Sequence, residues 1–127
     1  MAPSPRKLIL VIDDDPDQRR FLERMLSGAG YGVRTAPDGE AGLKLAVASP
    51  PSLIILDVMM PHLNGYQTCR ALRKNPATSG LPIIVLTTKD QPADEFWASE
   101  VGADAFLPKA ANLPLLLDTI SRLTEAP

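Results

Sequence analysis

The stretch Leu53-Ile54-Ile55-Leu56-Asp57 gives the clearest indication of the fold, because four consecutive apolar residues run directly into an acid. Two other segments of strand length, Leu8–Ile12 and Ile83–Leu86, are apolar in the same unbroken way. Alternating apolar and polar residues are typical of strands with one exposed face, whereas continuous runs indicate burial on both faces. These three segments therefore predict the central strands of a parallel sheet.

Weaker strand candidates and helical patterns fill the rest of the chain. The two weaker strands are Tyr31–Thr35 and Ala105–Leu107. The first helix is expected to begin after Asp15, an N-cap acid followed by a proline, and to end at Gly28 and Gly30. The other four helices are expected at Asp38–Ala48, at about Asn64–Lys74, near Pro92–Val101 and after Asn112. Five β-α units with right-handed crossovers predict an α/β fold, a doubly wound five-stranded parallel sheet with five helices.

Apolar spacing also predicts which helix faces turn inward. In the first helix the residues expected on one face are Phe21, Leu22, Met25, Leu26 and Ala29. In the last helix the inward residues are expected to be Leu115, Leu116 and Ile120.

Length, charge and cysteine content limit the class of protein. A chain of 127 residues predicts one domain over 1–127, with a core at about 7–123 and a flexible N-terminus at 1–6. Thirteen basic and 15 acidic residues argue against a nucleic-acid module. The one cysteine, Cys69, excludes an internal disulfide and fits a reducing compartment. The apolar run that ends before Asp13 is too short for a signal peptide or a membrane span, so a cytoplasmic protein without membrane insertion is expected.

Reactive side chains follow the predicted strands at the point where each strand ends. In chain order these residues are Asp13, Asp14, Asp15, Asp57, Thr87, Thr88 and Lys109. The carboxyl ends of parallel strands meet at one edge of the sheet, where open α/β proteins bind their ligands. The sequence therefore predicts a pocket that contains carboxylates, a hydroxyl and an ammonium group.

This combination favours phosphoryl transfer. Several carboxylates at close range repel one another unless a cation joins them, and oxygen ligands at a shallow site suit Mg²⁺. A carboxylate such as Asp57 can then attack a phosphoryl group and form an aspartyl phosphate. Taken singly, these residues have simpler explanations. Asp15 is best explained as a helix cap, and Asp13 and Asp14 fit capping or function equally well.

The ordered set of motifs resembles the receiver domains of two-component response regulators over about Lys7–Leu123. The motifs that carry the resemblance are Ile9-Leu10-Val11-Ile12-Asp13-Asp14-Asp15-Pro16, Leu56-Asp57-Val58-Met59-Met60-Pro61, Asn64-Gly65, Leu86-Thr87-Thr88, and Gly102-Ala103-Asp104 with Phe106-Leu107-Pro108-Lys109. The resemblance implies a flavodoxin-like fold with strand order 2-1-3-4-5.

The resemblance also implies a role for each site residue. Asp57 would accept the phosphoryl group from a histidine kinase or a phosphotransfer protein. Asp14, Asp57 and the Met59 carbonyl would bind Mg²⁺ directly, and Asp13 through a water. The remaining roles would be phosphoryl binding by Lys109, switching by Thr87 and Phe106, and tuning of phosphate lifetime by Met59, Thr88 and Lys89.

Partners follow from the same resemblance. A downstream protein target, and any weak dimer of an otherwise monomeric chain, would use the face formed by the fourth helix, the fifth strand and the fifth helix, without direct nucleic-acid contact. The segments Thr87–Gln91 and Asn64–Arg70 are similar to those of stand-alone regulators of type IV pilus chemosensory systems.

Several positions depart from the family pattern. Ala110 stands where a proline usually follows the lysine, so the Lys109-Ala110 bond is either trans with a rebuilt loop or cis and strained; we expect cis. Phe106 lacks a tyrosine's hydroxyl, and it is either a rotating switch or permanently buried. Bulky Met59 gives an attacking water no hydrogen bond, which predicts slow loss of phosphate.

Two other interpretations of function remain. The chain could be a receiver excised from a longer kinase or DNA-binding regulator. It could also be a phosphate-ester hydrolase with Asp57 as nucleophile, but such enzymes commonly place an acid two residues later, where this chain has Met59.

Overall fold

A computed structural model describes residues 7–57, 65–87, 102–108 and 113–124. Over these ranges five parallel strands form one sheet in the order β2-β1-β3-β4-β5. The strands are β1 (Leu8–Ile12), β2 (Gly32–Ala36), β3 (Leu53–Asp57), β4 (Ile83–Thr87) and β5 (Ala105–Pro108). The predicted parallel sheet and its strand order are therefore confirmed.

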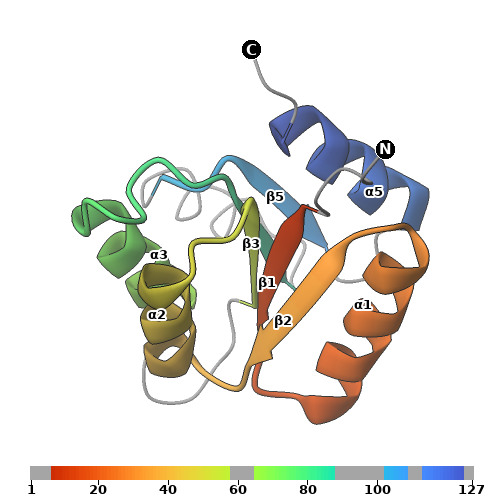
Figure 1. Ribbon diagram of the computed structural model, residues 1–127, viewed down its shortest axis with the longest axis horizontal. Coiled ribbons are helices and arrows are strands. Elements are labelled where there is room, and N and C mark those ends of the chain that lie inside the picture. The colour runs from red at the N-terminus through yellow and green to blue at the C-terminus, as the bar shows by residue number, and fades with distance from the viewer. Residues whose placement is uncertain (1–6, 58–64, 88–101, 109–112, 125–127) are drawn as a thin grey trace, which may run out of the picture.

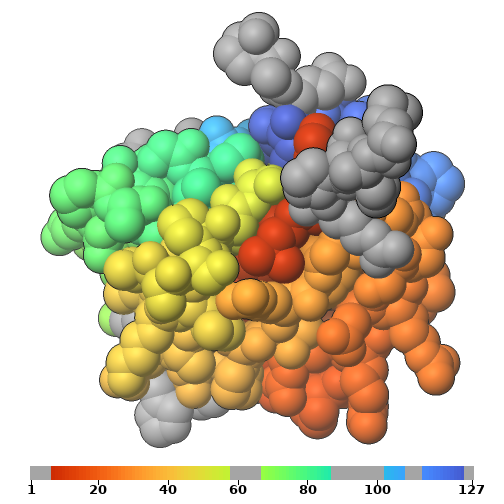
Figure 2. Space-filling model, in the orientation of Figure 1, coloured from red at the N-terminus to blue at the C-terminus, as the bar shows by residue number. Residues whose placement is uncertain are grey.

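Four helices cover the two faces of the sheet in the part of the chain that the structure describes. They are α1 (Pro16–Gly28), α2 (Gly39–Ala48), α3 (Gly65–Lys74) and α5 (Leu113–Thr124). Helices α1 and α5 lie on one face, and α2 and α3 on the other (Figure 1). In the space-filling view α2 and α3 lie on the left and α1 on the lower right, with orange atoms of β2 between them (Figure 2). The helix predicted near Pro92–Val101 lies outside the described residues.

The three central strands supply side chains to both faces, as their continuous apolar sequences predicted. In β1, Leu10 and Ile12 join the core beneath α2 and α3, whereas Ile9 and Val11 join the core beneath α1 and α5. The same alternation recurs in β3 and β4. Burial of each such side chain contributes about 1.5–3 kcal/mol, so two cores share one sheet and hold it rigidly between them.

Capping residues fix where the helices begin. Asp15 is the N-cap of α1, and its carboxylate accepts a hydrogen bond from the Asp17 backbone N–H at 3.0 Å. Asp38 does the same for α2, accepting from the Ala41 N–H at 2.8 Å. The predicted start of the first helix is therefore confirmed. Its end is confirmed as well, with Gly30 in the left-handed region at φ +100°.

Three residues expected to face inward do not. Phe21 is 55% exposed, Leu115 is 41% exposed, and Ala29, the C-cap of α1, is exposed as well, so these predictions were wrong. Each residue turns a helix by about 100°, so the residue just before a buried one points far from the buried stripe. That stripe runs through Leu22 and Leu26 in α1, and through Leu116 and Ile120 in α5, where the prediction holds.

Candidate functional site

Asp57 lies at the carboxyl end of the central strand of the sheet. It is the last residue of β3, where it is opposite Leu86 of β4, and it is only 2% exposed. Strand β3 lies between β1 and β4, so the neighbouring strand ends surround this carboxylate. The parallel register thus places the nearly buried carboxylate of Asp57 next to the residues at the carboxyl ends of β1 and β4.

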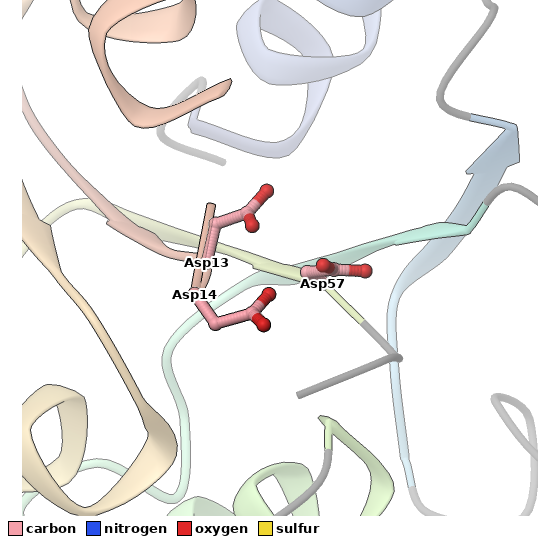
Figure 3. Close-up of side chains that lie close together, drawn as sticks. All are labelled: Asp13, Asp14 and Asp57. Atoms are coloured by element: carbon pink, nitrogen blue, oxygen red, sulfur yellow. The ribbon is translucent and has the colours of Figure 1, made fainter. Parts of the chain in front are cut away.

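Asp13 and Asp14 are the groups that follow β1. Ile12 is opposite Leu56 in the register, which places Asp13 beside Asp57. Asp13 is 1% exposed, whereas Asp14 is exposed. Carboxylate oxygens of Asp13, Asp14 and Asp57 all lie within 4.8 Å of one another (Figure 3). The sequence predicted these three carboxylates at one strand edge, and the structure brings them together.

The loop between β1 and α1 is held in place by its own hydrogen bonds. The Asp15 N–H donates to Oδ1 of Asp13 at 2.9 Å. Arg19, in the first turns of α1, donates from Nη1 to the backbone carbonyl of Asp13 at 2.7 Å. The Asp13 N–H in turn donates to the carbonyl of Ala36 at 3.1 Å. Asp13 is therefore fixed from both sides, and Asp14 follows it at a defined position.

This arrangement suits a hard divalent cation. Three carboxylates at this separation repel one another strongly in a partly buried setting, and a bound cation would relieve that repulsion. All three ligands are oxygens, which favours Mg²⁺ or Ca²⁺ over softer metals. One exposed carboxylate beside two buried ones leaves a side open to solvent and to a further ligand. The donor set therefore fits the predicted Mg²⁺.

The other predicted site residues are described only in part. Thr87 ends β4, one position beyond Leu86, which is opposite Asp57. Phe106 lies in β5 opposite Val85, is half-buried, and packs against the core beneath α2 and α3. The residues Met59, Thr88, Lys89 and Lys109 lie outside the described residues, and so does the Lys109-Ala110 bond predicted to be cis.

Some residues that hold the site loop or the sheet in place were given no role in the sequence prediction. Arg19 is one, because its partner is a backbone carbonyl and carbonyls carry no side-chain signature. Arg73 and Asp104 are others: Nη2 of Arg73 lies 2.7 Å from Oδ2 of Asp104, across 31 positions of sequence. The spacing of two single charges so far apart could not have identified the pair.

Known proteins are similar to this chain in sequence and in fold. Protein PilH of Pseudomonas aeruginosa is 40% identical over 113 residues, which cover 89% of this chain and 93% of PilH. Response regulator MprA of Mycolicibacterium vanbaalenii is 44% identical over 109 residues, 86% of this chain but 46% of MprA. This chain therefore spans less than half the length of MprA. The structure of chemotaxis protein CheY4 of Vibrio cholerae matches with a TM-score of 0.88 at 34% identity, covering 94% of this chain and 99% of CheY4.

No helix among the described residues is both long and apolar enough to cross a membrane. Residues 9–121 match the family described as the response regulator receiver domain, a range that begins in β1 and ends in α5 and so includes all three clustered carboxylates. Sequence, sheet order and acidic cluster agree, and the chain belongs to the receiver domain family of two-component signalling.

Proposed function

We propose that this protein is a phospho-accepting switch in which Asp57 takes a phosphoryl group from a phosphohistidine on a histidine kinase or phosphotransfer protein. The observation that carries the proposal is the position of Asp57, nearly buried at the end of β3 with Asp13 and Asp14 within 4.8 Å. A carboxylate held so firmly by a strand has little orientational freedom left to lose when it attacks phosphorus.

In the proposed reaction an oxygen of Asp57 forms a bond to phosphorus while the phosphorus–nitrogen bond of the donor breaks. The imidazole nitrogen keeps the bonding electron pair and gains a proton. Asp14, Asp57 and the Met59 carbonyl would hold Mg²⁺, with Asp13 acting through a water. The bound ion supplies positive charge against the charge that develops on the phosphoryl oxygens. Lys109 would pair with one of those oxygens.

The signal would then leave through a change of conformation. A phosphoryl group adds about two negative charges at one point, which can bias an existing equilibrium between two states. Thr87 would move toward the phosphoryl group, and Phe106 would move with it. Its half-buried position is compatible with two rotamers. The output face would combine the segment before β5 with β5 and α5, and bind a downstream protein or a second copy weakly.

The tuning of the switch belongs to the same proposal. Met59, Thr88 and Lys89 would set how quickly water removes the phosphoryl group, and Met59 favours slow loss. A cytoplasmic location and a place in a pilus-type chemosensory pathway are also proposed. The match to PilH along nearly its whole length supports the pathway. The partial match to MprA leaves room for the same domain in a longer chain.

The test is labelling by acetyl phosphate and by phosphorylated histidine kinases, followed by intact-mass analysis. The wild type should gain one phosphoryl group in the presence of Mg²⁺ and none with excess EDTA. Asp57→Asn should not be labelled, because an amide oxygen is a poor nucleophile. Asp118→Asn, which removes an exposed acid from α5, is the matched control and should be labelled at the wild-type rate. A wild type that no donor labels would refute the proposal.

A further inference from the structure

Arg73 uses its whole guanidinium group to join three segments of the chain. From the last turn of α3, Nη1 donates to the carbonyls of Ser79 at 3.0 Å and Leu81 at 2.6 Å. Nε and Nη2 donate to the carbonyl of Gly102 at 2.9 and 2.7 Å. Nη2 also donates to Oδ2 of Asp104 at 2.7 Å. A guanidinium has five N–H donors, and all five are engaged.

Asp104 carries this connection to the start of two strands. Its Oδ2 accepts from the Ile83 backbone N–H at 2.8 Å, as well as from Arg73. The Asp104 backbone N–H donates to the Ile83 carbonyl at 2.8 Å. Ile83 is the first residue of β4, and the pairing of β4 with β5 begins one residue later, with Ile84 opposite Ala105. Asp104 therefore closes the ladder at its amino end with two bonds to one residue.

Gly102 is adapted to the same contact. It has φ +88°, a backbone conformation that side chains rarely adopt. A Cβ at this position would come within 3.2 Å of Nε of Arg73. Glycine thus allows the carbonyl of residue 102 to face the guanidinium closely. Arg73, Gly102 and Asp104 form one structure, which we name the β5 clamp.

The clamp holds the amino end of β5 to the amino end of β4. In the described residues β5 pairs with β4 alone, through four residues at the edge of the sheet. A strand rises about 3.3 Å per residue and cannot shorten, so a shift at its first residue is passed on to its last. A slip by one residue would also exchange its two faces and move Phe106 out of the core beneath α2 and α3. The residue that follows β5 in the chain is Lys109.

We propose that Arg73 and Asp104 are positioning residues for phosphoryl transfer, because the β5 clamp fixes the register of β5 and thereby the point from which Lys109 reaches the phosphoryl group. The inference rests on the proposed function of Asp57 and Lys109. Neither Arg73 nor Asp104 touches the reacting atoms. The acidic cluster is carried by β1 and β3, so it does not depend on the clamp.

The experiment compares labelling rates of Arg73→Lys and Asp104→Asn with the wild type, using acetyl phosphate and Mg²⁺. Arg73→Lys keeps the charge but cannot replace all five hydrogen bonds to these four acceptors. Asp104→Asn keeps an oxygen for the Ile83 N–H but loses the charge that binds Arg73. A displacement of about 1 Å can lower a rate by about 100-fold, so each variant should be labelled about 10- to 100-fold more slowly. Arg20→Lys, which disturbs an exposed ion pair on α1, is the control and should match the wild type.

Two further measurements separate positioning from a general loss of stability. Mg²⁺ binding, followed by the amide NMR signals of the acidic cluster, should be the same in Arg73→Lys and wild type. In a Lys109→Ala background, adding Arg73→Lys should cause no further loss of labelling, because the group that it positions is gone. A clamp that acted only on stability would weaken Mg²⁺ binding and slow labelling equally in both backgrounds.

The outcomes distinguish this inference from the proposed function. If the wild type is not labelled, the function of Asp57 fails and the role of the clamp fails with it. If the wild type is labelled and folded Arg73→Lys is labelled as quickly, only the role of the clamp is overturned. Equal losses from Arg73→Lys with and without Lys109 would overturn it too.

Discussion

The Arg19 side chain donates a hydrogen bond of 2.7 Å to the backbone carbonyl of Asp13, and so fastens the first turns of α1 to the acidic cluster. We expect Arg19→Lys to weaken Mg²⁺ binding by about tenfold, the lower end of what loss of an outer partner of a metal site costs. Lysine retains the positive charge, so the change isolates the lost orientation of the loop. NMR titration with Mg²⁺ measures the affinity.

Arg20→Lys serves as the control for this prediction, because Arg20 is exposed and contacts Asp17 instead of the site loop. It should bind Mg²⁺ as the wild type does. Equal affinity in Arg19→Lys and wild type would mean that the Asp13 loop holds its shape without Arg19.

The acidic cluster should make the stability of the protein depend on Mg²⁺. A ligand that binds only the folded state stabilises it by about 2.7 kcal/mol at a concentration one hundred times its Kd. We expect thermal unfolding of the wild type to shift upward with Mg²⁺, and Asp57→Asn to lose most of that shift. In EDTA, Asp57→Asn should be the more stable protein by about 1 kcal/mol or more, because one of three repelling charges is gone. A variant that is less stable than the wild type in EDTA would contradict this account of the cluster.

The sheet could be predicted because each strand is indicated by a short stretch of sequence. Unbroken apolar runs such as Leu53–Leu56 indicate strands that are buried on both faces. The order of strands and helices along the chain then allows only a few topologies for the sheet. The site followed from the sheet, since acids that end neighbouring parallel strands must meet. Asp13, Asp14 and Asp57 could be placed at one edge of the sheet on that basis, and the resemblance to receiver domains supplied the order in which β1 and β3 are neighbours.

The contacts that the sequence could not predict are those made to backbone groups, because every residue carries them. The guanidinium of Arg73 binds the backbone carbonyls of Ser79, Leu81 and Gly102, and any residue can supply a carbonyl. Phe21 was placed inward by the spacing of apolar residues along the helix, yet the neighbouring core needs only the stripe through Leu22 and Leu26. The packing of α1 against the sheet, and not the hydrophobicity of Phe21, determines that this side chain is exposed.

Substitution of Phe21 tests directly whether the buried face of α1 runs through Leu22 and Leu26 and excludes Phe21. Phe21→Ala should change the free energy of unfolding by less than about 1 kcal/mol, because 55% of this side chain is already in water. Leu26→Ala, which empties a fully buried position five residues later, should cost about 2–5 kcal/mol. Urea denaturation followed by circular dichroism measures both. If both changes lowered the free energy of unfolding by similar amounts, Phe21 would have to be counted as a core residue.

Cys69 predicts how stability should change at alkaline pH. Burial raises the pKa of its thiol to about 11, an effect that the charge of Arg73 opposes and that of Asp104 reinforces. The unfolded chain therefore releases this proton at lower pH than the folded protein does. The stabilising contribution is complete below the ordinary thiol pKa of 9.0 and is lost as the pH rises toward 11.

The measurement is urea unfolding of wild type and Cys69→Ala at a series of pH values across that interval. Alanine leaves a cavity, so the variant should be less stable at neutral pH by an amount that does not itself titrate. The gap between the two proteins should narrow on raising the pH, by at most about 2–3 kcal/mol at about 1.4 kcal/mol per pKa unit. Other groups that titrate in this range are common to both chains and cancel in the difference. A gap that stays constant up to pH 11 would show that the folded protein does not withhold the proton, and that the thiol is less isolated from water than its position on the buried face of α3 indicates.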